Sequence, residues 1–590
     1  MLARSILLRL SFAALLYPAA AAARQAAQNS DKPAPAGATA ATPPGVIRST
    51  TRLVQISVVV HDKQGNPVTN LKKEDFSLFD EGARQEIAYF AVTPPAVAVP
   101  AQLLPHNAFT NRYDLKGEDP GAVTVILFDL LNTSVEDQPY VRKQVLRFLQ
   151  NVKPQDHIAV YCLTTRLVIL HEFTQDSSAL VEAVKHFTPK EIAAFDASHP
   201  VRFQIAALAD DPMWARFEDA LNNNTGLIAD INTINRIGTT VSAIKGIADH
   251  LSGVAGRKSL VWVSGGFPIQ IGIPSIGGGF ISQDQHQTDT TNQLPRPDRE
   301  SNSYDENARA AADALNRVNM AMYTVDAHGV ALNTGSDPGL RNGGFAQTTF
   351  ALNSEQDSRT TSRLLADRTG GLAFFGNNDI NDALHHAQDD GRFAYTISFY
   401  PNHGNWDGKF RKIKIESAGS GLQLRYRQGY YASPDRSDPE KTVSIELQQA
   451  ADSPLDATSL GLIVSGKADG PPSVRKLDLH IGVDPKQLLL QNSDGHRKGA
   501  LDLFFLQRDD TGKSLEAEKQ HLAVNLDEKQ YEFLSQAAMV FDRHITVDAE
   551  TAEIRVLVRD AGSGALGSVT IPAQTFFQPE TKPAAPATNP

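Results

Sequence analysis

Residues 129–134, Asp-Leu-Leu-Asn-Thr-Ser, place a carboxylate, an amide and two hydroxyl groups directly after an apolar run. The run, Val123–Phe128, is mostly apolar and β-branched or aromatic, which predicts a strand buried on both faces. Open α/β sheets bind ligands beyond the carboxyl ends of their strands, where Asp129 would lie. Carboxylate and hydroxyl oxygens suit a hard cation such as Mg²⁺. The alternative is that Asp129 only bonds backbone N–H groups of its own loop.

No other pattern in the sequence indicates catalysis. It contains no H-E-x-x-H, no G-x-S-x-G and no phosphate-binding glycine loop between a strand and a helix. His385 and His386 are adjacent on a predicted helix, so they point to different faces and are poor joint ligands. Ser134 has no identifiable base. The single cysteine, Cys162, excludes an internal disulfide and lies in an apolar run, as a buried core thiol would. We therefore predict no catalytic residues and no certain cofactor.

The segments around Asp129 alternate between apolar strands and helical patterns. Further buried strands are predicted at 158–163, 259–263 and 320–325, with an edge or hairpin strand at 167–170. Helices are predicted near 141–149, 177–187, 238–251, 304–319 and 380–389. This alternation predicts right-handed crossovers and an α/β fold: a mostly parallel sheet with helices on both faces.

The amino-terminal residues have the pattern of an export signal. Arg4 and Arg9 supply positive charge, 6–16 is largely apolar, and small residues up to Ala23 offer a cleavage site. The apolar stretch is too short to span a bilayer, and no other stretch reaches about 18 apolar residues. We therefore expect an exported protein, periplasmic or extracellular, with no membrane span in its mature form. The net charge is −11 and no long Lys/Arg run occurs, which argues against nucleic-acid binding.

Composition and strand periodicity suggest a division of the chain into six parts. They are a signal peptide at 1–23, a disordered linker at 24–48, a small β-rich domain at 50–92, an α/β domain with long loops and C-terminal β-strands at 121–432, a β-sandwich at 440–576, and a disordered tail at 577–590. The domain at 50–92 is marginal by size, so we expect it to pack on its neighbour. The first strand predicted for the β-sandwich is the alternating run Thr442–Leu447.

Seven short motifs occur in a specific order and spacing. They are Val54–Val60, Leu71–Phe76, Phe79–Gly82, Val125–Thr133, Ser259–Pro268, Trp406–Ile413 and Arg427–Tyr431. In these motifs the chain resembles the von Willebrand factor type A (VWFA) superfamily, and more closely the secreted VWFA-related proteins of Acidobacteria. The resemblance covers roughly 50–432 and implies a Rossmann-like VWFA domain, with 440–575 outside it.

The resemblance implies a metal-ion-dependent adhesion site. In VWFA domains three loops build it: Asp-x-Ser-x-Ser after the first strand, a Thr, and an Asp after the fourth strand. The matching ligands of Mg²⁺ here would be Asp129, Thr133 and Thr239, with Asn132, Thr240 and Ser264 as alternates.

The sequence departs from the VWFA pattern at two positions of this site. Leu131 stands where the motif has its first Ser, and Gly265 stands where the third loop has its Asp. The site has thus lost a hydroxyl and a carboxylate, although Mg²⁺ usually takes one or two carboxylates besides water.

We expect a secreted, non-enzymatic binding protein of the adhesion type. Its VWFA-like domain would engage a protein or a cell-surface partner through the carboxyl edge of the sheet. Three long polar segments, 190–235, 269–302 and 327–358, adjoin that edge and are longer than a compact domain needs. The alternatives are an extracellular hydrolase with its site in these loops, and a structural component of the cell envelope.

Overall fold

The computed structural model describes residues 53–92, 104–105, 107–116, 121–153, 156–188, 232–254, 256–266, 299–327, 358–375, 380–433, 440–470 and 475–577. All of them belong to one compact unit, Arg52–Pro590. The predicted signal peptide, the predicted linker and residues 578–590 of the predicted tail lie outside them. Within these ranges no helix combines the length and the apolar character needed to cross a membrane.

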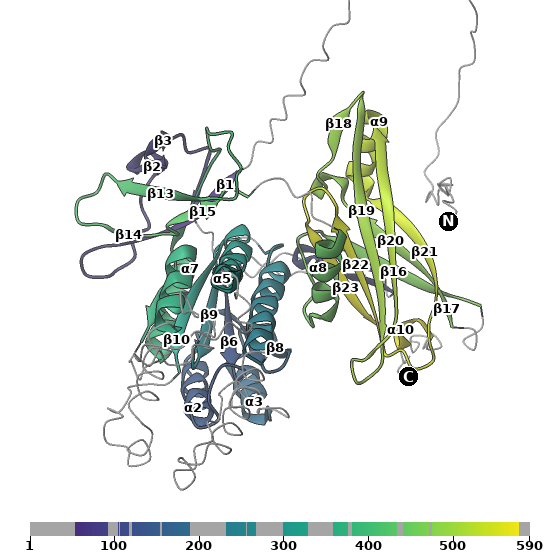
Figure 1. The fold of residues 1–590 in the computed structure, drawn as a ribbon, viewed down its shortest axis with the longest axis horizontal. Coiled ribbons are helices and arrows are strands. Elements are labelled where there is room, and N and C mark those ends of the chain that lie inside the picture. Colours follow the sequence, from purple (N-terminus) through teal and green to yellow (C-terminus); the bar gives the residue numbers. More distant parts are fainter. Residues whose placement is uncertain are drawn as a thin grey trace, which may run out of the picture. The chain divides into compact units, whose positions relative to one another are not determined.

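A mixed six-stranded sheet forms the α/β part of the chain, in the order β11-β10-β9-β6-β7-β8 (Figure 1). Its strands are β6 (Val123–Asp129), β7 (His157–Leu163), β8 (Leu167–Thr174), β9 (Lys258–Ser264), β10 (Met320–Asp326) and β11 (Ala373–Phe374). Neighbours are parallel except for β7 and β8, which are antiparallel. The strand order reverses between β6 and β9, the place where open α/β sheets bind ligands.

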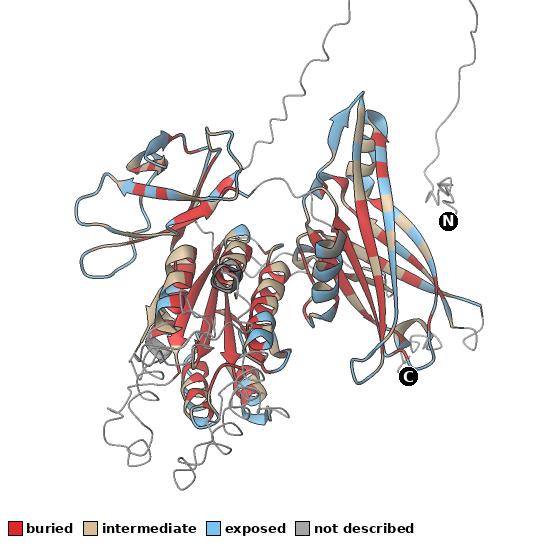
Figure 2. Ribbon diagram, in the orientation of Figure 1, coloured by how far each residue is buried: buried red, intermediate tan, exposed pale blue. Residues whose placement is uncertain are grey.

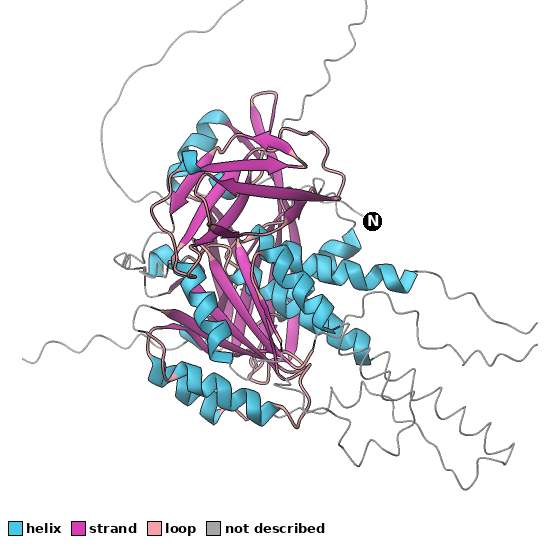
Figure 3. Cartoon of the chain, turned by 90° about the vertical axis from the view of Figure 1, so that its left-hand side faces the viewer, coloured by secondary structure: helices cyan, strands magenta, loops and turns pink. Residues whose placement is uncertain are grey.

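Helices cover both faces of this sheet, and the strands between them are buried (Figures 2 and 3). They are α2 (Gln138–Leu149), α3 (Ser177–His186), α5 (Arg299–Arg317), α7 (Ile380–Arg392) and the helical residues 232–250 and 358–369. Side chains of a strand alternate between faces, so Val125 and Leu127 pack with α5 and 232–250, while Ile126 and Phe128 pack with α2, α3 and α7. The predicted mostly parallel sheet with two helical layers is present.

A second part, here called the β-module, consists of two four-stranded antiparallel sheets. Their orders are β14-β1-β12-β4 and β15-β13-β2-β3. The strands are β1 (Val54–His61), β2 (Phe76–Asp80), β3 (Ala83–Gln85), β4 (Tyr89–Val92), β12 (Ala394–Phe399), β13 (Phe410–Ser417), β14 (Gln423–Arg425) and β15 (Gly429–Tyr431). The inward side chains of both sheets form one apolar cluster.

The β-module crosses the predicted boundary between 50–92 and 121–432. Strand β1 pairs with β12 from Val54↔Phe399 to Val59↔Ala394. The Tyr395 hydroxyl donates to the Val68 carbonyl at 2.8 Å and accepts from the Leu71 N–H at 3.0 Å. Alternation in the sequence locates such strands but does not say which strands pair with each other. Residues 50–92 are too few to bury their own apolar faces, so they pack with strands from further along the chain.

A β-sandwich occupies the carboxyl-terminal region, as two sheets around one apolar cluster. One sheet has the order β21-β17-β16-β5; the other has the order β18-β19-β22-β23, with β20 also paired to β19. The strands are β5 (Ala108–Thr110), β16 (Leu462–Asp469), β17 (Lys476–Val483), β18 (Gln491–Ser493), β19 (His496–Arg508), β20 (Ser514–Asp527), β21 (Met539–Thr546), β22 (Glu553–Asp560) and β23 (Leu566–Pro572).

The sandwich differs from the sequence prediction at two places. Strand β5 comes from the connector before the α/β part and pairs with β16. The strand expected at Thr442–Leu447 is wrong, because Glu440–Asp452 forms helix α8. Leu447 and Ala451 are both buried and lie four residues apart, which is the spacing of one helical face. The run Thr442–Leu447 is so short that its pattern is compatible with a strand and with a helix. The remaining elements are η1 (Lys73–Asp75), α1 (Tyr113–Lys116), η6 (Pro485–Gln487), α9 (Glu528–Ala537) and α10 (Gln574–Phe577).

We predict that Gly371→Ala destabilises the α/β part by about 2–3 kcal/mol. Gly371 lies just before β11, and a Cβ there would come 1.9 Å from the Met322 carbonyl oxygen of β10. Urea denaturation followed by circular dichroism measures the loss. The control is Gly238→Ala, because a Cβ at that helical position meets nothing within 4 Å. Equal stability of the two variants would show that β11 can move away from β10 without cost.

Candidate functional site

Strands β6 and β9 bring three polar side chains together at their carboxyl ends. Their parallel register sets Asp129 opposite Ser264 and Leu127 opposite Trp262. Since side chains on a strand alternate, Trp262 and Ser264 point to the same face as each other and as Asp129. The parallel register of β6 and β9 and the alternation of side chains along each strand therefore bring these three residues together.

The Asp129 carboxylate is fully buried and accepts from four donors, an arrangement here called the carboxylate centre. Its Oδ2 accepts from Trp262 Nε1 at 2.9 Å, from Ser264 Oγ at 2.9 Å and from Asn132 Nδ2 at 2.8 Å. Its Oδ1 accepts from the Asn132 backbone N–H at 3.0 Å. Hydrogen bonds to an ionised acceptor are the stronger kind, and here they take the place of water around the charge.

The helical residues 232–250 supply a second set of contacts through Asn132. Arg236 donates to Asn132 Oδ1 from Nε at 3.1 Å and from Nη2 at 2.9 Å. Asn132 Nδ2 also donates to Thr240 Oγ1 at 2.9 Å, and that hydroxyl donates to the Arg236 carbonyl at 2.8 Å. Because a guanidinium can only donate, it fixes the amide with its oxygen toward Arg236 and its nitrogen toward Asp129.

The two loops beyond β6 and β9 are joined through Thr133. Its hydroxyl donates to the Asp129 carbonyl and accepts from the Gly265 N–H at 2.8 Å. Leu131 lies in the apolar core, and its N–H donates to the Leu163 carbonyl at 3.0 Å. Leu131, where the resemblance noted in the sequence would expect a metal-binding serine, is thus a packing residue.

The structure brings five of the six predicted metal-site residues together: Asp129, Asn132, Thr133, Thr240 and Ser264. Thr239 is only half-buried and lies outside this network, because it is a residue away from Thr240 on the helix, about 100° around its axis. The sequence reading missed Trp262 and Arg236. Trp262 lies two residues before Ser264 on one strand and needs a partner for its N–H, and Arg236 lies one helical turn before Thr240.

Burial sets the electrostatics of the carboxylate centre. It raises the pKa of the Asp129 carboxyl, while the donors from Asn132, Ser264 and Trp262 act in the opposite direction. Burial also lowers the pKa of the Arg236 guanidinium to about 10, and the charge of Asp129 counteracts that fall. The negative charge of Asp129 thus favours the charged form of Arg236, and the hydrogen-bond donors favour the charged form of Asp129, each against the cost of burial.

The donors around Asp129 do not fit Mg²⁺, which prefers an octahedron of oxygen ligands. The one carboxylate already accepts four hydrogen bonds, the amide of Asn132 turns its nitrogen toward it, and the guanidinium of Arg236 supplies a positive charge nearby. Within the described ranges no group of three or more His, Cys, Asp or Glu side chains is arranged to hold a metal ion.

Four other residues singled out in the sequence make contacts that belong to a turn or to the packing of the core. The Ser134 hydroxyl donates to the Asp137 carboxylate at 2.6 Å, just before α2. His385 lies edge-on to the Phe148 ring, while the neighbouring His386 faces a different ring. Cys162 is buried in the core, and burial raises the pKa of its thiol, which keeps it protonated.

Comparison with known proteins gives no family. No protein-family model and no curated protein matches the chain. Among solved structures, it is similar to an aerotolerance-related membrane protein of Bacteroides fragilis carrying multiple mutations to serine, with 11% identity, a TM-score of 0.24, and coverage of 46% of this chain and 100% of that one.

Two pilus proteins are similar at the same low level. Three N-terminal domains of a type V pilus tip protein of Porphyromonas gingivalis share 10% identity at a TM-score of 0.24, with coverage of 83% of this chain and 78% of that one. A pilus adhesin of Lactobacillus rhamnosus shares 8% identity at 0.23, with coverage of 86% and 58%. All three scores lie below 0.5, so these similarities carry no argument about what this chain binds.

We predict that Ser264→Ala costs about 2 kcal/mol, because it removes a hydrogen bond to a buried charge. Ser259→Ala, on the same strand, is the matched control. The Ser259 hydroxyl donates to the neutral Ala387 carbonyl at 3.0 Å, so its loss should cost about 1 kcal/mol or less. Chemical denaturation of both variants gives the difference. A loss no larger for Ser264→Ala than for Ser259→Ala would contradict a charged Asp129.

We predict that Arg236→Met destabilises the fold more at high pH than at low pH. Without the guanidinium, the folded-state pKa of Asp129 rises further above its unfolded value of about 3.9. The folded state then binds more protons than the unfolded state, so stability falls as the pH rises from about 4 toward the raised pKa. We expect a loss of about 3 kcal/mol near pH 8 and a smaller one near pH 5.

Urea denaturation at the two pH values measures this difference. The control is the double variant Arg236→Met/Asp129→Asn, which has no charge to titrate and should show no pH-dependent loss from this pair. If Arg236→Met lost the same stability at both pH values, the charges of Arg236 and Asp129 would not be coupled.

Proposed function

We propose that the chain is a non-enzymatic binding protein of the adhesion type, built around a VWFA-like sheet that works without a metal ion. The observation that carries this proposal is the carboxylate centre. Asp129 is fully buried and accepts from Asn132, Trp262 and Ser264. A carboxylate engaged in this way is poorly placed to bind a cation or to take a proton from a substrate.

The topology of the sheet supports the VWFA-like assignment. The strand order reverses between β6 and β9, and Asp129 ends the first strand of the sheet, where that superfamily has its first metal ligand. Thr133 and Thr240 also occupy positions that the resemblance assigns to the site. The centre thus retains part of the ligand set in a purely hydrogen-bonded role.

The partner would bind without the metal bridge that other VWFA domains use, in which a partner carboxylate completes the metal shell. We place the contact on the surface at the same edge of the sheet. Val135 and Ile234 are 44% and 56% exposed and flank the centre in the sequence, three residues after Asn132 and two before Arg236. Exposed apolar side chains beside polar groups suit a protein or another component of a cell surface.

The predicted signal peptide supports a role outside the cytoplasm, in the periplasm or beyond the cell. The hydrolase alternative gains no support from the residues around Asp129. Ser134 donates to the Asp137 carboxylate three residues further on, a local contact at the start of α2 with no histidine involved, and the Cys162 thiol is buried.

The metal-free reading predicts no saturable heat when Mg²⁺ or Mn²⁺ is titrated into the EDTA-stripped, full mature chain, up to millimolar metal. Binding of the labelled chain to isolated cell envelopes should then be equal in EDTA and in Mg²⁺. We expect Val135→Asp/Ile234→Asp to weaken that binding at least tenfold, equivalent to about 1.4 kcal/mol.

Ile445→Asp is the control for this experiment, because Ile445 is 49% exposed but lies on α8, in another part of the chain. A saturable metal signal that disappears in Asp129→Asn would overturn the metal-free reading. Envelope binding unaffected by the double variant would place the partner contact elsewhere.

A further inference from the structure

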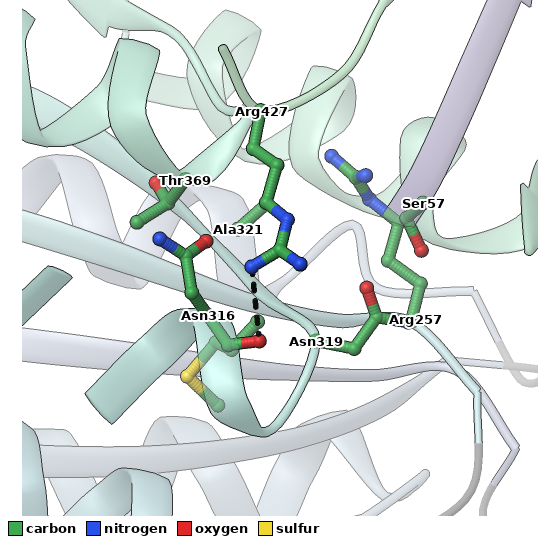
Figure 4. A pocket seen from close by; sticks show the side chains of 8 residues that line it. Ser57, Arg257, Asn316, Asn319, Ala321, Thr369 and Arg427 are labelled. Atoms are coloured by element: carbon green, nitrogen blue, oxygen red, sulfur yellow. Dashed lines mark hydrogen bonds between the residues drawn. The ribbon is translucent and has the colours of Figure 1, made fainter. Parts of the chain in front are cut away.

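A small polar cavity lies at the opposite ends of the central strands, where β9 and β10 begin (Figure 4). Ser57 of β1 and Arg427 line it from the β-module side, and Arg257 and Asn319 line it from the α/β side. Its volume is about 10 Å³, close to the minimum for one water-sized occupant. A chloride ion, which is somewhat larger than water, would fit if the polar side chains around it moved slightly outward. Sulfate, phosphate and organic carboxylates are too large for it.

Four buried polar atoms on these side chains have no hydrogen-bond partner: Ser57 Oγ, Arg257 Nε, Asn319 Nδ2 and Arg427 Nε. Ser57 and Arg257 are 6% and 1% exposed. All four atoms can donate, and the two Nε–H groups can do nothing else. Buried polar groups are nearly always paired, so four unpaired donors at one cavity indicate an acceptor as occupant.

Other nitrogen atoms of both guanidinium groups are engaged elsewhere. Arg257 Nη2 donates to the Gly370 carbonyl at 2.9 Å and to the Tyr323 hydroxyl at 3.1 Å. Arg427 Nη2 donates to the Gln55 carbonyl at 2.8 Å, and its Nη1 lies 3.5 Å from the Asn316 carbonyl, the contact dashed in Figure 4. These contacts hold both groups in place and leave each Nε–H unpaired.

The surroundings of the cavity carry excess positive charge. In the described part of the chain no carboxylate lies within ion-pair distance of Arg257 or Arg427, and Asp390 nearby is paired with Arg425. The charge of Asp313 acts on Arg427 from farther away, but Arg309, Arg317 and Arg368 act on the same carboxylate. Lys258, next to Arg257, is also buried and donates only to carbonyls, those of Gly256 and Val318. Burial lowers the pKa of Lys258 to about 7 and that of Arg427 to about 10.

We propose that this cavity binds one monoatomic anion of the chloride class, held between Arg257 Nε–H and Arg427 Nε–H, with Ser57 and Asn319 completing its shell. A water molecule accepts only two hydrogen bonds and brings no charge. An anion accepts from all four donors and offsets the buried positive charge. The site is independent of the carboxylate centre, and its ligand has the opposite charge to a metal ion.

The bound anion would join the β-module to the α/β part, because two of its donors come from each. Binding therefore stabilises the folded chain by mass action, and above the dissociation constant this stabilisation grows with the logarithm of the halide concentration. We expect calorimetric unfolding of the full mature chain to shift upward by about 3 °C when chloride or bromide replaces gluconate at constant ionic strength.

Asn319→Asp tests the identity of the occupant without changing the shape of the side chain. Asn319 has φ +56°, a conformation that Asp also tolerates, so the variant should fold. Its carboxylate would stand in for the anion, and the halide-dependent shift should disappear. Asn492→Asp is the control, because Asn492 is an exposed residue of β18 in the sandwich, and this variant should keep the shift.

Crystals grown in bromide give a direct measurement that needs no variant. One anomalous-scattering peak between Arg257 and Arg427 would support the proposal. A melting transition insensitive to halide, together with no anomalous peak at that place, would overturn it and identify the occupant as water.

Discussion

The α/β part of this chain depends on one buried negative charge. A carboxylate in a protein core is stable only when donors replace the water it has lost. Asp129 receives those donors from its own loop, from the neighbouring strand, and indirectly from a helix that brings Arg236. The parallel register of β6 and β9, the alternation along β9 and the turn of the helix must all be correct for these donors to meet. The carboxylate centre can therefore form only when the central strands and this helix are packed correctly.

The sequence predicted this architecture where a single period dominates. The run Val123–Phe128 has apolar side chains for both faces, and its shortness and β-branched residues favour an interior strand over a helix. The helices between such strands imply the parallel sheet. Prediction failed where partners are far apart in the sequence. Nothing in Val54–Val60 says that Ala394–Phe399 covers it, and nothing in Ala108–Thr110 says that it extends a sheet of the sandwich.

At the site, the sequence identified the oxygen atoms but not their neighbours. Asp129, Thr133 and Ser264 could be predicted because they follow two apolar runs, at positions where the resemblance implies metal ligands. Trp262 and Arg236 take part because of register and helix phase, which become visible only when the strands are paired. The choice between Thr239 and Thr240 is of the same kind, since one residue on a helix changes the direction of a side chain by about 100°.

The pairing of β1 with β12 has a consequence for how the chain reaches its fold. The Tyr395 hydroxyl and the Leu71 amide that it contacts are 324 positions apart in the sequence. At about 5–20 residues per second, a ribosome takes roughly 15–65 seconds to make that interval. Through that time Val54–Val60, an apolar strand of high β propensity, has no partner and resembles the segments that start aggregation. Safe production of this protein thus requires that the nascent segment be shielded until its distant partner strand has been made.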